Sequence, residues 1–136
     1  MKHLFSYFLL FFSLIAFSQN EQLAQNYFEK GEFEKAIISY EELLKNQPSN
    51  SFYFQKLIES TQQLQKYDVA EKLIQERLDK YRQPANLVEL GYNFQLKKDT
   101  SKSKKYFDQA VEKIKENPSN VYAIASSFEK KVLLDY

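Results

Sequence analysis

The chain has 136 residues, no cysteine, one histidine and a formal net charge of +1 at neutral pH. The lack of cysteine excludes disulfides, thiolate metal sites and a lipid-modified cysteine, so the chain is not a lipoprotein. Acidic and basic residues are interspersed and nearly equal in number, which gives no support for nucleic acid or an anionic membrane as a partner.

Residues 1–18 are predicted to be a secretory signal peptide. A short basic start is followed by an almost wholly apolar run from Leu4 to Phe17, and small residues precede a cleavage point after Ser18. The run is shorter than the roughly 20 residues that a membrane-spanning helix needs, so a retained anchor or a buried N-terminal helix is the weaker interpretation. We therefore expect an exported protein, periplasmic or at the cell surface, with no stable membrane span after cleavage.

Residues 19–136 are predicted to form a helical repeat domain. The only glycines and prolines of the chain are Gly31, Gly91, Pro48, Pro84 and Pro118. The prolines recur at intervals of roughly 35 residues, which is typical of a helical repeat array. The expected repeats cover residues of about 20–50, 51–84, 85–118 and an incomplete 119–136.

Each repeat is expected to contain two amphipathic helices, because apolar residues recur in steps of three and four. The break between the helices is predicted at Gly31 in the first repeat, near Gln65 in the second and before Thr100 in the third. In the second repeat, the second helix is expected to bury one stripe of side chains: Val69, Ala70, Leu73, Ile74, Leu78 and Tyr81. Ser and Asn after Pro48 and again after Pro118 are suited to capping the helices that follow.

The first repeat resembles the tetratricopeptide repeat. The residues that carry the resemblance are Leu23, Ala24, Tyr27, Gly31, Phe33, Ala36, Tyr40 and Pro48. The later repeats match less fully, since Ile58 and Gln65 replace the small residue and the turn glycine, and Ser103 replaces the second-helix alanine. The resemblance implies an all-α, right-handed α-solenoid of antiparallel helix pairs, with about three and a half repeats.

In that family the first helices of the repeats line a concave groove that holds a peptide or a partner helix. By register, the residues expected to face such a groove are Gln25, Phe28, Phe52, Gln55, Lys56, Glu59, Tyr92, Asn93 and Tyr122. The alternative interpretation is that any one of these residues is ordinary solvated surface with no role in binding. Some relatives bind a C-terminal carboxylate through a basic clamp, but only Lys56 supplies positive charge at the matching positions, so no such clamp is expected.

The sequence offers little for catalysis. Downstream of residue 18 there is neither histidine nor cysteine, and Ser-Lys neighbours around Ser101 and Ser103 are more simply a solvated helix start. Carboxylates alternate with lysines as on ordinary helix surfaces, and two isolated glycines do not make a phosphate loop. We expect no enzyme, no metal and no cofactor.

The leading functional interpretation is an exported scaffold that binds a protein or peptide in its groove. The alternative is an N-terminal module or fragment of a larger envelope protein whose activity lies beyond Tyr136, because the expected last helix begins there with nothing to pack against. An enzyme or small-molecule binder is the third class, and it would need a deep polar site.

Overall fold

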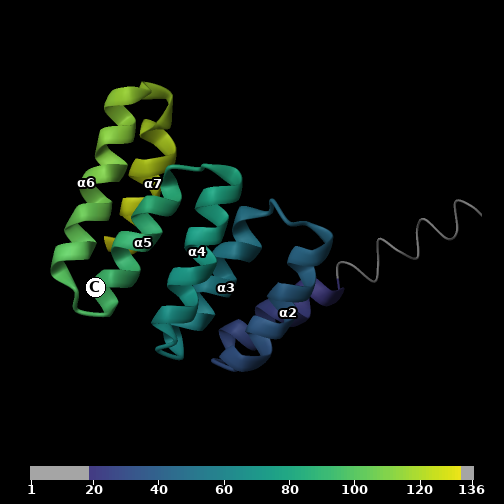
Figure 1. The fold of residues 1–136 in the computed structure, drawn as a ribbon. Helices are drawn as coiled ribbons and strands as arrows, with labels where there is room; N and C mark the ends of the chain where they lie inside the picture. Colours follow the sequence, from purple (N-terminus) through teal and green to yellow (C-terminus); the bar gives the residue numbers. More distant parts are fainter. Residues whose placement is uncertain (1–18, 133–136) are drawn as a thin grey trace, which may run out of the picture. The chain divides into compact units, whose positions relative to one another are not determined.

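The computed structural model describes residues 19–132, which divide into two compact units at residues 64 and 65 (Figure 1). Within the described residues every regular element is a helix, and this confirms the predicted all-α class of paired helices. None of the described helices is long and apolar enough to cross a membrane. The predicted signal peptide, residues 1–18, and the last four residues lie outside the described part.

Unit 1 contains a helix over residues 19–29, α2 (Phe33–Asn46) and α3 (Ser51–Gln63). Gly31 has a φ of 72° and turns the chain between the first two helices, as predicted. A side chain is strained in this left-handed region, whereas glycine enters it freely. Ala24 and Ala36 are fully buried, one in each helix of this pair. A larger side chain at either position would push the two helices apart.

The third helix of unit 1 begins at a proper cap. The Oδ1 atom of Asn50 accepts hydrogen bonds from the backbone N–H groups of Phe52 and Tyr53, at 3.0 and 3.1 Å. These bonds satisfy amide donors that a helix start otherwise leaves unpaired. α2 and α3 pack together, and the rings of Tyr40 and Tyr53 lie 6.3 Å apart, centre to centre.

Unit 2 contains α4 (Tyr67–Tyr81), α5 (Ala85–Leu96), α6 (Thr100–Glu116), the 3₁₀ turn η1 (Pro118–Asn120) and α7 (Val121–Val132). α5 lies at its centre and packs against α4, α6 and α7. An apolar cluster of Leu87, Val88, Ala110 and Ile124 joins α5, α6 and α7. The second predicted repeat is therefore divided, with its first helix in unit 1 and its second helix in unit 2.

The turns between helices use the same left-handed conformation with different residues. Gln65, Arg82 and Lys98 have φ angles of 56°, 50° and 61°. Gln65 and Lys98 stand where Gly31 stands in the first repeat, so the turn geometry is kept although the glycine is absent. At each of these three positions the backbone conformation is strained for a residue with a side chain, and glycine would avoid that strain.

Some local predictions were wrong. Val69 was expected on the buried stripe of α4, but 51% of it is exposed. The two Pro-Ser-Asn tripeptides also differ: Asn50 caps α3, whereas Pro118–Asn120 forms a 3₁₀ turn in which Asn120 donates a hydrogen bond to the Lys113 carbonyl at 3.0 Å. Asp99 caps α6, because its carboxylate accepts a hydrogen bond from the backbone N–H of Lys102 at 3.0 Å.

Candidate partner-binding surface

Unit 1 brings predicted groove residues of two helices together. The ammonium nitrogen of Lys56, on α3, lies 4.0 Å from the ring centre of Phe28, on the helix over residues 19–29. This cation–π contact shows that the first helices of two successive repeats lie side by side within unit 1. We call the surface formed by Gln25, Phe28, Phe52, Gln55, Lys56 and Glu59 the unit 1 face.

Polar side chains on the unit 1 face hold one another in place. Lys56 forms an ion pair with Glu59 at 2.8 Å, and the side-chain amide of Gln55 donates to the other oxygen of that carboxylate at 2.9 Å. Gln25 donates to Glu29 at 2.8 Å. Phe52 is 44% exposed although its ring packs edge-on against Tyr53. The face thus offers an exposed aromatic ring beside partly buried, ordered polar groups, a mixture suited to protein contacts.

Negative charge gathers near the buried tyrosines of unit 1. Burial, with a smaller contribution from the carboxylates of Glu21, Glu59 and Glu29, raises the pKa of Tyr40 to about 12. Burial also raises the pKa of Tyr53, helped by the hydrogen bond that its hydroxyl makes with Glu21. A negative field favours the neutral phenol because it opposes formation of the phenolate.

The three predicted groove residues in unit 2 have different surroundings. Tyr122 is 82% exposed on α7, whereas Tyr92 is only 8% exposed and lies under the ammonium of Lys131 at 4.8 Å. Asn93 is fully buried, and its side-chain amide donates to the Tyr67 carbonyl at 2.9 Å. Asn93 therefore ties α5 to the start of α4 and has no exposed surface to offer a partner.

Lys131 was not anticipated from the sequence. It lies on the buried side of α7 and pairs with Glu89 of α5 at 3.0 Å. A usable signal did exist, since Lys131 follows the buried Ile124 by two helical turns and therefore falls on the same stripe. A lysine on an apolar stripe needs a carboxylate on the neighbouring helix.

The structure also places the acidic residues and the Ser-Lys stretch considered above for metal binding and catalysis. Among them, no three histidine, cysteine or acidic side chains come close enough to share a metal ion. In the Ser-Lys stretch at the start of α6, Lys104 pairs with Asp108 at 2.6 Å, and Ser103 is buried against the fold. The Lys104 ammonium therefore already has a carboxylate partner, and Ser103 is largely withdrawn from solvent.

Comparison with protein-family models supports the predicted resemblance of the first repeat to the tetratricopeptide repeat. Residues 20–50 match the family model described as tetratricopeptide repeat. Curated protein sequences gave no match to the chain.

Two solved structures are similar in fold. The crystal structure of PcrH in complex with the chaperone binding region of PopB has a TM-score of 0.63 and 16% identity, covering 84% of this chain and 93% of PcrH. The type III secretion translocator chaperone SycD of Yersinia enterocolitica, in an alternative dimer, has a TM-score of 0.61 and 20% identity, covering 88% of this chain and 93% of SycD. The chain thus has an all-α helical repeat fold, and its residues 20–50 match the tetratricopeptide repeat model.

Proposed function

We propose that this chain is an exported protein-interaction scaffold that binds an extended peptide or a helix of a partner protein along the first helices of its repeats. The observation that carries the proposal is the unit 1 face, where Phe28 and Lys56 from successive first helices meet at 4.0 Å. The solved structures of similar fold add support, because PcrH holds a region of PopB and SycD is a translocator chaperone.

The composition of the unit 1 face suits a protein partner better than a small molecule. An exposed aromatic ring buries much area at little cost in conformational entropy, and the Lys56–Glu59 pair is already ordered before a partner arrives. Small-molecule sites are usually deep and enclose most of their ligand, while this face is a surface on two adjacent helices.

Site-specific photo-crosslinking in living cells of the source organism would test the proposal. A photoreactive amino acid would replace Phe52 or Tyr122, and Val111 would be the control because it is 45% exposed on α6 and outside the predicted surface. We expect one protein to be crosslinked from positions 52 and 122 and not from 111. Equal crosslinking from all three positions, or none from 52 and 122, would contradict binding along the first helices.

Export has its own test. N-terminal sequencing of the chain purified from the envelope fraction is expected to begin at Gln19, since the predicted cleavage follows Ser18. A chain that keeps Met1, or that is recovered wholly from the cytosol, would contradict export while leaving the crosslinking result intact.

A further inference from the structure

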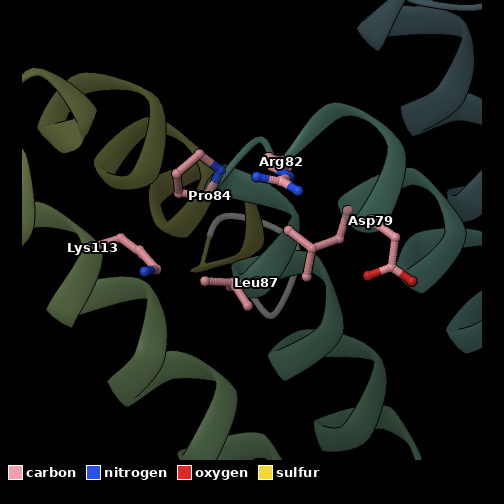
Figure 2. A pocket seen from close by; sticks show the side chains of 6 residues that line it. Asp79, Arg82, Pro84, Leu87 and Lys113 are labelled. Atoms are coloured by element: carbon pink, nitrogen blue, oxygen red, sulfur yellow. The ribbon is translucent and has the colours of Figure 1, made fainter.

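An open pocket of about 580 Å³ lies in unit 2, where the end of α4, the start of α5 and the end of α6 meet (Figure 2). Its lining residues are Leu78, Asp79, Arg82, Pro84, Leu87 and Lys113. None of them belongs to the predicted partner-binding residues, so the pocket is a separate feature of the molecule.

The floor of the pocket is apolar and firmly held. Leu87 belongs to the core cluster of unit 2, and Leu78 packs against that cluster from α4. Because the floor is continuous with a packed core, it does not collapse into the space above it. Apolar surface that remains in contact with water in such a pocket gains free energy when an apolar side chain covers it.

Two cations stand over this floor, and one of them is held in an unusual way. Arg82 ends α4 in the left-handed conformation, with its backbone N–H bonded to the Leu78 carbonyl at 2.7 Å. Its guanidinium makes no hydrogen bond or ion pair with any residue in the described part of the chain. Glycine is the low-cost residue for this position, so the strained arginine adds a free charge to the pocket at some cost in stability.

Lys113 supplies the second cation. Its ammonium pairs with Glu116 at 2.6 Å, but both side chains are about half exposed. Exposed pairs of this kind contribute little, so Lys113 can exchange Glu116 for another carboxylate. Among the described residues that line the pocket, Asp79 is the only acid, and it accepts a hydrogen bond from Gln75 at 2.9 Å. Figure 2 shows Asp79 and Lys113 on opposite sides of Leu87, so the pocket keeps a net positive side.

We propose that this pocket binds an acidic protein segment, with a leucine-sized side chain on the Leu78 and Leu87 floor and a neighbouring carboxylate on Arg82. A guanidinium that pairs with no described residue can donate two parallel hydrogen bonds to one carboxylate. The open shape favours a side chain that projects from a peptide, because sites for free small molecules enclose most of their ligand. The site shares no residue with the unit 1 face and does not depend on the proposed function.

Nuclear magnetic resonance titration of the ¹⁵N-labelled chain would test the site. The probe is the peptide acetyl-Ser-Glu-Leu-Glu-Ser-amide, and we expect its binding to shift the backbone amide signals of Arg82, Leu87 and Lys113. Replacing both glutamates by glutamine, or the leucine by alanine, is expected to weaken binding about fivefold or more, as for the loss of one charge pair or apolar contact.

Arg82→Gly separates binding from folding. This variant is expected to bind the peptide about fivefold more weakly while its urea unfolding midpoint stays equal or rises, because glycine relieves the left-handed strain. Arg82→Lys is expected to keep more of the affinity, and Lys113→Gln to lose part of it. Lys115→Gln is the matched control, since Lys115 lies on α6, pairs with Glu112 at 2.9 Å and does not line the pocket.

Several results would overturn the proposal. They are unchanged affinity in Arg82→Gly, equal binding of the glutamine peptide, and the absence of shifts at the pocket. Sodium decanoate is an anionic amphiphile without a peptide backbone, and shifts caused by decanoate but not by the peptide would assign the pocket to a lipid-like ligand instead.

Discussion

The ammonium nitrogen of Lys131 lies 3.0 Å from the Glu89 carboxylate, and the two side chains are only 5% and 13% exposed. The pair joins α7 to α5, and the Tyr92 ring lies 4.8 Å from the same ammonium. Charges withdrawn from water in this way depend on each other, because neither has solvent to replace its partner.

Lys131→Met is therefore expected to destabilise unit 2 by about 3 kcal/mol, since it leaves the Glu89 carboxylate buried without a counter-charge. Urea unfolding followed by circular dichroism would measure the change. In the double variant Glu89→Leu with Lys131→Met, most of the lost stability is expected to return, because no buried charge is left alone. A double variant less stable than Lys131→Met would show that the unpaired Glu89 carboxylate does not cause the loss of stability.

Two adjacent lysines are expected to respond to glycine in opposite directions. Lys98 has a φ of 61°, so Lys98→Gly is expected to stabilise the chain by roughly 0.5–1 kcal/mol. Lys97 has a φ of −71° and pairs with Asp68 and Glu71 at 2.6 and 2.9 Å, so Lys97→Gly is expected to destabilise it. Thermal unfolding midpoints of the two variants would decide, and a shift of the same sign in both would refute the assignment of strain to Lys98.

Gly91 marks a close approach between α5 and α6. A Cβ atom placed on Gly91 would come within 2.4 Å of the Phe107 ring, which is well inside van der Waals contact. Gly91→Ala is expected to cost roughly 1–3 kcal/mol, the usual range for overpacking a core. The combination with Phe107→Leu is expected to recover part of that loss, measured by urea unfolding. If Gly91→Ala alone proves neutral, the close approach does not constrain the helices.

The raised pKa of Tyr40 is expected to make the folded chain less stable at alkaline pH. Its pKa is raised to about 12 in the folded chain, compared with about 10 for an exposed phenol. Between these values the unfolded chain gives up the phenol proton while the folded chain keeps it, so the free energy of unfolding falls as pH rises from about 10 to about 12. The full effect is about 2–3 kcal/mol, and it would be followed by urea unfolding at several pH values.

Tyr40→Phe is the matched control for that prediction. The Tyr40 hydroxyl is buried and makes no hydrogen bond within the described residues, so its removal is expected to be neutral or stabilising by about 1 kcal/mol at pH 7. The variant should also lose the part of the alkaline slope that belongs to this group. An unchanged slope would mean that other tyrosines or lysines cause it.

Helix register in the sequence predicted the surroundings of some candidate site residues correctly and those of others wrongly. Phe28 and Lys56 could be placed on one face because helix register fixes which side chains share a stripe, and the two residues do meet. Asn93 had a similar register, yet it is buried, because the Tyr67 carbonyl at the start of the neighbouring helix accepts its hydrogen bond. Helix register says which side of one helix a residue occupies, and says nothing of what the next helix places opposite.

The sequence by itself determined the helical class, the helix breaks near Gly31, Gln65 and Thr100, and the small residues Ala24 and Ala36, which are buried. These features depend on local propensity and on three- and four-residue spacing, both of which act within a single helix. The tertiary structure alone decided the Glu89–Lys131 pair, the contact of Gly91 with Phe107, and the pocket that gathers Arg82, Leu87 and Lys113. Each of these joins different helices, and the distance between two helices is set by how all their side chains pack together.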